Sequence, residues 1–174
     1  MSYRLNFENR ILDHYFDILK QRSSGNLLIK DRYFFSVNLN IEKDNLFVSG
    51  DHFEKIQFKI PTRINKIHKA FDNIACLYCI EYKKMKYFPY LNKITYNNVN
   101  FFLNEIHNKI FSNVVFDLEA GINKKDLYQL LWERDKDISI NKLDTHLTNL
   151  KNLIFINFNL LINFKSAKNF LYLN

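Results

Sequence analysis

Two runs of helix-spaced apolar residues, separated by a charged break, occupy residues 124–153 and restrict the fold more than any other stretch of the chain. In the first run Leu127, Leu130 and Leu131 lie on one stripe of a short amphipathic helix. The charged residues at 133–137 have no apolar surface to bury, so they are predicted to form a turn. The pattern therefore predicts two helices joined by a short polar connection.

The second helix is predicted to start at Ser139, whose hydroxyl can accept a hydrogen bond from a free amide of the first turn. Its apolar residues share one face and are expected to meet a core: Leu143, Leu147, Leu150 and Ile154. The opposite face carries amides and hydroxyls where a solvated helix normally carries Glu and Lys. Such groups can hydrogen-bond to the edges of bases. These polar residues are Asn141, Lys142, Thr145, Thr148, Asn149 and Asn152.

This helix pair resembles the OmpR/PhoB-type winged helix, the DNA-binding effector domain of bacterial response regulators. That family has a helix ending in Leu-hydrophobic-x-Trp, a polar loop, and a recognition helix that reads roughly Thr-Leu-Asp-Thr-His-Ile-Ser-Arg-Leu-Arg-Lys-Lys-Leu. Leu130-Leu131-Trp132 matches the end of the first helix. Residues 143–154, LDTHLTNLKNLI, match the recognition helix in register and without a gap.

The C-terminus resembles the β-hairpin wing of the same family. Residues 160–164 and 169–173 look like its two strands, joined by a tip at 165–168 that lacks the family's glycines. The resemblance covers about residues 75–174. It implies an α+β protein in which a small antiparallel sheet precedes a winged helix-turn-helix with a wing hairpin.

The resemblance implies that the chain is a DNA-binding transcriptional regulator that contacts double-stranded DNA. The recognition helix would lie in the major groove and the wing would reach phosphates or the adjacent minor groove. The residues expected at the DNA are Asn141, Lys142, Thr145, Thr148, Asn149, Lys151 and Asn152 on the helix, and Lys165 and Lys168 on the wing.

The helix departs from the family pattern in its charge. Asn149 stands where the family has Arg, and of the basic cluster that follows only Lys151 remains. Fewer cations mean weaker phosphate anchoring. Either DNA affinity is modest and relies on a homodimer or on a partner in the transcription machinery, or the helix faces a protein surface. In the second case the chain is a non-catalytic interaction adaptor or anti-regulator.

Composition excludes few classes of partner. The net charge of +7 divides into +3 before residue 74 (12 basic and 9 acidic residues) and +4 after it (13 and 9), with no polybasic arm in either half. A Lys-rich soluble domain explains this charge as well as nucleic-acid binding does. No window is long and apolar enough to span a bilayer, and the N-terminus lacks the apolar segment of a signal peptide. We expect a cytoplasmic protein that does not contact membranes.

Residues 1–74 are expected to form a separate small α+β module for dimerisation or partner binding. The pattern predicts a helix at 8–22, strands between 27 and 60, and a second helix at 61–74 with Ile64, Ile67, His68 and Phe71 on one face. A receiver domain needs about five βα units and an acidic phosphoacceptor cluster. The module has neither, so we expect the regulator to act independently of phosphorylation.

Residues 75–111 are predicted to form a small antiparallel sheet followed by a helix. The alternating runs at 75–82, 85–88 and 93–96 are predicted to be strands, and Ile94-Thr95 resembles the end of the family's last strand before the first helix. That helix is expected at about 97–111, with Val99, Phe102, Leu103, Ile106 and Ile110 pointing inward, followed by a loop at 112–121.

The Cys76-x-x-Cys79 pair is the only motif that suggests other chemistry, because two thiolates at this spacing can bind one metal or form one disulfide. The pair lies in a β-like run without two further ligands, so we expect two small buried residues. In the resemblance His146 serves helix packing, and we expect Asp144 to orient a neighbouring side chain. No catalytic constellation is present. We therefore expect no enzyme activity, cofactor or metal.

Overall fold

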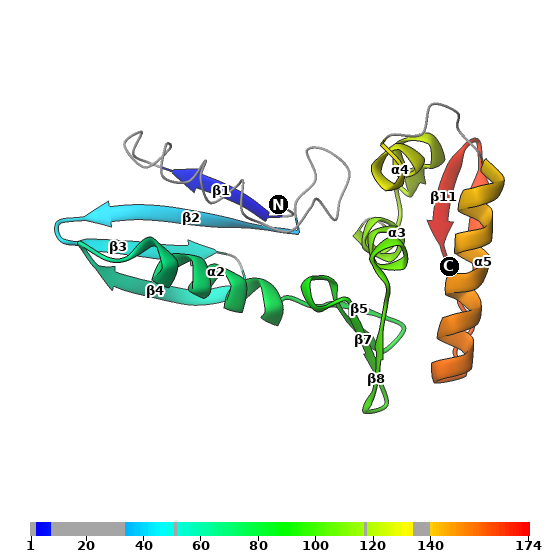
Figure 1. Ribbon diagram of the computed structural model, residues 1–174, viewed down its shortest axis with the longest axis horizontal. Helices are drawn as coiled ribbons and strands as arrows, with labels where there is room; N and C mark the ends of the chain where they lie inside the picture. Colours follow the sequence, from blue (N-terminus) through cyan, green and yellow to red (C-terminus); the bar gives the residue numbers. More distant parts are fainter. Residues whose placement is uncertain (1–2, 8–33, 51, 117, 134–139) are drawn as a thin grey trace. The chain divides into compact units, whose positions relative to one another are not determined.

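The computed structural model describes residues 3–7, 34–50, 52–116, 118–133 and 140–174. These residues form four α-helices and three small sheets, which confirms the predicted α+β class (Figure 1). They divide into two compact units, one ending at Tyr78 and the other beginning at Cys79. The sequence pattern placed this boundary after residue 74. The boundary lies further along because a helix continues to Leu77.

The N-terminal unit contains a four-stranded sheet in the order β1-β2-β3-β4. The strands are β1 (Tyr3–Phe7), β2 (Phe35–Glu42), β3 (Asn45–Gly50) and β4 (Phe53–Lys59). β1 pairs parallel with β2, and the other pairs are antiparallel. The strands predicted after residue 33 are confirmed, whereas β1 was not predicted. The helix predicted at 8–22 and the run at 27–30 lie outside the described residues.

Helix α2 (Ile64–Leu77) lies along this sheet and buries Ile67, Phe71 and Ile74. It begins three residues later than predicted, after a cis Ile60–Pro61 peptide bond. His68 was expected on the buried face. It is only half-buried, and its Nδ1 lies 2.9 Å from the Asp72 carboxylate.

The strand predicted at 75–82 is wrong in its first half. Cys76 lies in the last turn of α2 and is half-buried, and Cys79 is exposed. Only Ile80–Tyr82 forms a strand. The expectation of two buried cysteines is therefore also wrong. A short apolar run carries no periodicity that separates a helix end from a strand.

The C-terminal unit starts with an antiparallel meander, β5-β6-β7-β8. Its strands are β5 (Ile80–Tyr82), β6 (Met85–Phe88), β7 (Lys93–Tyr96) and β8 (Val99–Phe102), with a 3-10 turn at Pro89–Leu91 after β6. Ile94-Thr95 therefore lies in β7 and not in the last strand. The helix predicted from residue 97 is also wrong at its start, because Asn97 and Asn98 have positive φ (47° and 63°) and turn the chain into β8. Val99 and Phe102 are consequently exposed.

Three helices and a hairpin follow the meander. They are α3 (Glu105–Phe116), α4 (Lys124–Leu131), α5 (Ile140–Phe158), and the strands β10 (Phe164–Ala167) and β11 (Phe170–Leu173). The short strand β9 (Ile122–Asn123) pairs with β11, so the order of this sheet is β10-β11-β9. The predicted loop at 112–121 is wrong up to Phe116, because α3 continues to that residue. The predicted start of α5 at Ser139 and the turn after Glu133 fall outside the described residues.

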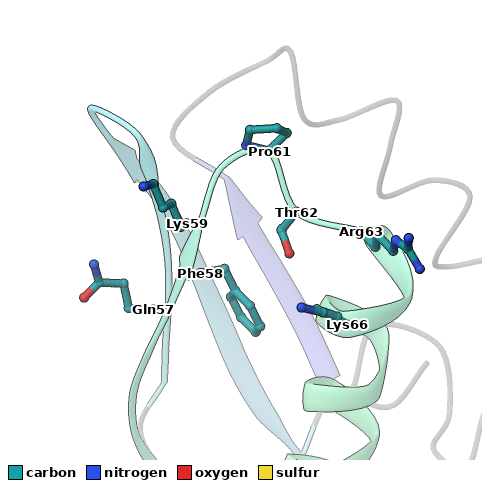
Figure 2. Close-up of a pocket in the computed structure, with 7 residues that line it drawn as sticks. All are labelled: Gln57, Phe58, Lys59, Pro61, Thr62, Arg63 and Lys66. Atoms are coloured by element: carbon teal, nitrogen blue, oxygen red, sulfur yellow. The ribbon is translucent and has the colours of Figure 1, made fainter.

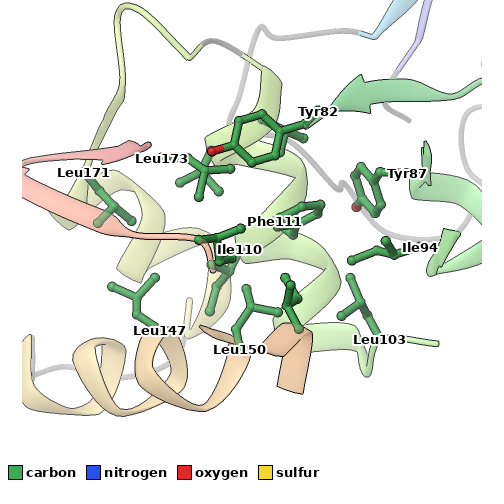
Figure 3. Packing of buried hydrophobic residues seen from close by; sticks show 14 of the residues in the cluster. Tyr82, Tyr87, Ile94, Leu103, Ile110, Phe111, Leu147, Leu150, Leu171 and Leu173 are labelled. Atoms are coloured by element: carbon green, nitrogen blue, oxygen red, sulfur yellow. The ribbon is translucent and has the colours of Figure 1, made fainter. Parts of the chain in front are cut away.

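One hydrophobic cluster joins the elements of the C-terminal unit. It includes the four apolar residues predicted for α5, Leu143, Leu147, Leu150 and Ile154, all of them buried. Figure 3 shows Leu147 and Leu150 pointing toward Ile110 of α3 and Leu171 of β11. Each fully buried Leu or Ile contributes roughly 1.5–3 kcal/mol relative to an exposed one. The inner face of α5 is therefore fixed by the core.

A buried polar network ties the meander to α3. The Tyr87 hydroxyl lies 2.7 Å from Asn108 Oδ1 and also bonds to the hydroxyl of Ser112. Asn108 Nδ2 donates to the carbonyl of Pro89 at 3.0 Å. Burial raises the pKa of the Tyr87 hydroxyl far above its ordinary value. The network is fully partnered and fixes α3 against β6.

Candidate nucleic-acid interface

The outer face of α5 is an open polar surface. Asn141, Thr145, Thr148, Asn149 and Asn152 are all exposed and follow one another at helical spacings of three and four. Because the opposite face is held in the core, the rotation of the helix about its axis is set. The structure therefore brings these five residues together as the sequence pattern predicted.

The two threonines on this face are held by the helix backbone. Thr145 Oγ1 donates to the carbonyl of Asn141 at 2.9 Å, and Thr148 Oγ1 donates to the carbonyl of Asp144 at 3.0 Å. Each hydroxyl proton is thereby occupied, which leaves an oxygen acceptor and a methyl group for a ligand. A base contact at these positions would take a donor such as an exocyclic amine, or a thymine methyl.

Three asparagines on this face have side-chain amides that are not held by the rest of the protein. Within the described part of the chain, the side chains of Asn141, Asn149 and Asn152 form no hydrogen bond. An Asn amide offers both a donor and an acceptor edge and can bind adenine in a bidentate manner. The face can therefore offer hydrogen bonds to bases with little competition from the protein.

The cations of the predicted site lie at the margins of this face. Lys142 is half-buried, with Nζ 4.3 Å from the centroid of the Trp132 ring. This cation-π contact keeps the charge while it restricts the side chain. Lys151 is also half-buried and lies toward the side of the helix. The cations that α5 could offer to a phosphate are therefore two lysines, both half-buried.

Asp144 is partnered by a lysine from the preceding helix. Lys124 Nζ, whose side chain is 15% exposed, lies 2.9 Å from Asp144 Oδ1. This ion pair offsets a negative charge beside the polar face and joins the start of α4 to α5. It agrees with the expectation that Asp144 interacts with a neighbouring side chain. The sequence pattern did not single out Lys124, because the two residues are 20 positions apart.

Four aromatic and histidine rings contact one another in series between α4, α5 and α3. The rings of Tyr128 and Trp132 are tilted with centroids 4.6 Å apart, and those of Trp132 and His146 are tilted at 5.5 Å. His146 meets His107 of α3 edge to face at 5.6 Å between centroids. His146 thus packs between helices, as the resemblance implied. His107 was not singled out, although it is buried and its ring nitrogens have no partner among the described residues. Burial, and then the neighbouring His146, lower the pKa of His107.

The hairpin differs in detail from the predicted wing. The predicted first strand at 160–164 is wrong except for Phe164, because α5 runs to Phe158 and β10 starts only at Phe164. Lys165 lies within β10 opposite Tyr172, and the tip is a two-residue turn of Lys168 and Asn169 with φ of 48° and 68°. Both lysines are exposed, but only Lys168 lies at the tip.

Beyond the polar face, the C-terminal end of α5 exposes apolar side chains that the sequence pattern did not predict. Phe155 and Ile156 are 44% and 75% exposed and lie one turn beyond Asn152. The resemblance predicts a recognition helix that ends at Ile154, so both residues fall beyond it. The continuation to Phe158 could have been recognised, because Phe158 lies four residues after Ile154 on the core face.

Two further properties concern the described residues alone. They contain no group of three or more His, Cys, Asp or Glu side chains placed to hold a metal ion. Within the same ranges, each helix is too short or too polar to cross a membrane.

No family model, curated protein or solved structure matches the chain.

Proposed function

We propose that the C-terminal unit is an OmpR/PhoB-like winged-helix domain that binds double-stranded DNA, and that the chain is a cytoplasmic transcriptional regulator acting without phosphorylation. The observation that carries the proposal is the outer face of α5. Its exposed amides and threonines lie on a helix whose inner face is fixed by the core. Such a helix can present hydrogen-bonding groups to base edges in a major groove.

The order and pairing of the other elements support this proposal. A four-stranded meander is followed by α3, α4 and α5, and then by a hairpin whose last strand pairs with β9. This is the element order that the resemblance to the winged-helix family implied. In the proposed arrangement α5 is the recognition helix and the β10-β11 hairpin is the wing.

The distribution of charge sets the expected strength of binding. Lys142 and Lys151 flank the polar face, and Lys165 and Lys168 lie on the hairpin. Four lysines can neutralise at most about four phosphates, which gives a slope of log K against log salt of about −3.6. We therefore expect modest affinity for a single chain, reinforced by a homodimer or by a partner protein.

The test of this proposal is a binding series of the full chain with random-sequence duplex DNA at several salt concentrations, followed by selection and sequencing of the bound fraction. We expect salt-dependent binding and an enriched sequence motif. Absence of binding at low salt, with the chain folded, would refute the proposal.

Hairpin variants test the role of the wing. Replacing Lys165 and Lys168 together with Ala should weaken binding to all sequences and reduce the salt slope by about two units at most. Lys86→Ala is a suitable control, because Lys86 is exposed on β6 and belongs neither to α5 nor to the hairpin. An unchanged slope in the double variant would remove the hairpin from the interface.

Substitutions on α5 test base readout separately. Asn149→Ala should change the selected motif and cost about 1–3 kcal/mol on the preferred sequence if a base contact is lost. Thr148→Val keeps the shape and the methyl group but removes the oxygen acceptor. Equal losses on all sequences for both variants would argue against base readout by this face.

A second function is favoured by the apolar end of α5. Phe155 and Ile156 are exposed beside the polar residues, and exposed apolar side chains of this size are common in protein contacts. A chain that does not bind DNA would therefore be assigned as an interaction adaptor or anti-regulator that uses the same helix.

A further inference from the structure

The N-terminal unit contains a hollow between the end of β4 and the start of α2. Its volume is about 600 Å³, within the range of small-molecule sites. Residues of β4, of the connection through Pro61, and of the first turn of α2 line it (Figure 2). The hollow lies within the N-terminal unit, and none of its described lining residues belongs to α5 or to the β10-β11 hairpin.

The lining of this hollow is cationic. It includes Lys59, Arg63 and Lys66, and none of the described residues that line it is Asp or Glu. Among the described residues, no carboxylate forms an ion pair with any of the three cations. Three positive charges around one hollow favour an anion over a cation, and all three side chains are exposed to solvent.

The start of α2 adds further donors at the same place. Arg63, the N-cap residue, has an extended backbone and no side-chain capping hydrogen bond, and the first turn contains no acidic residue. The Lys66 amide donates to the Arg63 carbonyl at 2.9 Å, so in the described part of this 14-residue helix the amides without an acceptor are those of Ile64 and Asn65, at the end where the helix dipole is positive. An anion in the hollow would accept from these amides and from the cations together.

One wall of the hollow is apolar. Phe58 is half-buried, and Figure 2 shows the Thr62 hydroxyl and the Lys66 amine pointing toward its ring. Lys59 and Arg63 extend outward at the rim (Figure 2). An aromatic wall beside a cationic one suits a ligand that carries a flat apolar part together with its charge.

We propose that this hollow binds a small molecule that carries a phosphate ester group and a flat apolar part. The phosphate contacts Lys66, Thr62 and the amides of Ile64 and Asn65, and Arg63 and Lys59 at the rim add positive charge. The apolar part lies against Phe58. The N-terminal unit would then be a ligand-binding module.

The experiment is isothermal titration of the full chain with phenyl phosphate and, separately, with inorganic phosphate. The same titrations are made with Lys66→Gln and Arg63→Gln, which remove one lining charge each. The matched control is Lys69→Gln, because Lys69 is exposed on the same helix and does not line the hollow. Circular dichroism shows that each variant is folded.

We expect saturable binding of phenyl phosphate that is tighter than binding of inorganic phosphate. Each lining variant should weaken it by about tenfold, as expected for the loss of a charged hydrogen bond. Lys69→Gln should change it by less than about twofold, because Lys69 does not line the hollow and would form no hydrogen bond to the ligand.

Three results would overturn the proposal. The first is no saturation with either compound at millimolar concentration. The second is equal weakening by Lys69→Gln, or equal affinity for the two compounds, since either leaves only unspecific attraction of anions. The third is that the lining variants weaken binding of duplex DNA while neither compound binds, which would make the hollow a contact for nucleic-acid backbone.

Discussion

The Tyr87 hydroxyl provides a sharp test of the core of the C-terminal unit. Tyr87→Phe removes one oxygen and keeps the shape of the ring. Asn108 Oδ1, 2.7 Å from the hydroxyl, then loses its donor in a fully buried site. Ser112 can rotate its hydroxyl to a carbonyl of its own helix, so only one group stays unsatisfied. The expected loss of unfolding free energy is about 1–3 kcal/mol.

A second tyrosine serves as the matched control. Tyr82 belongs to the same buried cluster, but its hydroxyl has no hydrogen-bond partner among the described residues. Tyr82→Phe should therefore leave the stability unchanged or raise it slightly, since no partner is lost. Both substitutions remove one buried hydroxyl, but only Tyr87→Phe removes hydrogen bonds.

Urea unfolding followed by circular dichroism measures both variants against the parent chain. A loss of 1 kcal/mol corresponds to about 4–8 °C in Tm for a unit of this size. The pKa of Tyr87 is raised, so its contribution is complete below pH 10 and is lost as the pH rises further. Tyr87→Phe should remove this alkaline loss. Equal destabilisation by both variants, or none by Tyr87→Phe, would refute the assignment of the network.

Two further predictions concern pH and backbone conformation. The pKa of His107 is lowered from 6.5, so the unit should lose stability as the pH falls below 6.5 toward the folded pKa, and His107→Leu should flatten this slope in urea titrations. A persisting slope would assign it to other groups. Gly121 has φ +66°, and a Cβ there would lie 2.6 Å from the Tyr172 ring and 2.9 Å from the Leu171 carbonyl oxygen. Gly121→Ala should therefore cost at least about 1–2 kcal/mol in thermal unfolding, and an unchanged Tm would contradict this geometry.

The sequence predicted the elements whose periodicity is long. The apolar residues of α5 recur over three turns, and all four are buried. β2 alternates over eight residues, with Phe35, Val37 and Leu39 buried. In such elements the pattern and the core agree, since a single face has to meet the rest of the unit.

Short elements were predicted poorly because their residues fit two structures. Val99, Phe102 and Leu103 have helical spacing, yet Val99 and Phe102 lie in β8. The deciding feature is local, because Asn97 and Asn98 adopt the left-handed conformation that Asn tolerates better than most residues. The Asn pair before this apolar run is therefore a turn signal, which the helical spacing of the apolar residues alone does not reveal.

Part of the candidate site could not be predicted because it depends on distant pairs. The polar face of α5 follows from the sequence alone. The pairing of Lys124 with Asp144 and the packing of His107 on His146 each join residues on different helices. Asn108 and Ser112 would be expected on a solvated face, but Tyr87 of another element holds them in the core.

Lys124 also connects the hairpin to α5. Its backbone amide donates to the carbonyl of Asn169 in the hairpin turn at 2.9 Å, and its ammonium group pairs with Asp144 on α5. The turn and the outer face of the helix are thus tied through one residue before any ligand arrives. A partner that contacts both would lose less conformational entropy on binding than one that had to order two independent segments. Preorganisation of this kind compensates for a small number of cations, because affinity depends on what binding must immobilise as well as on the contacts it forms.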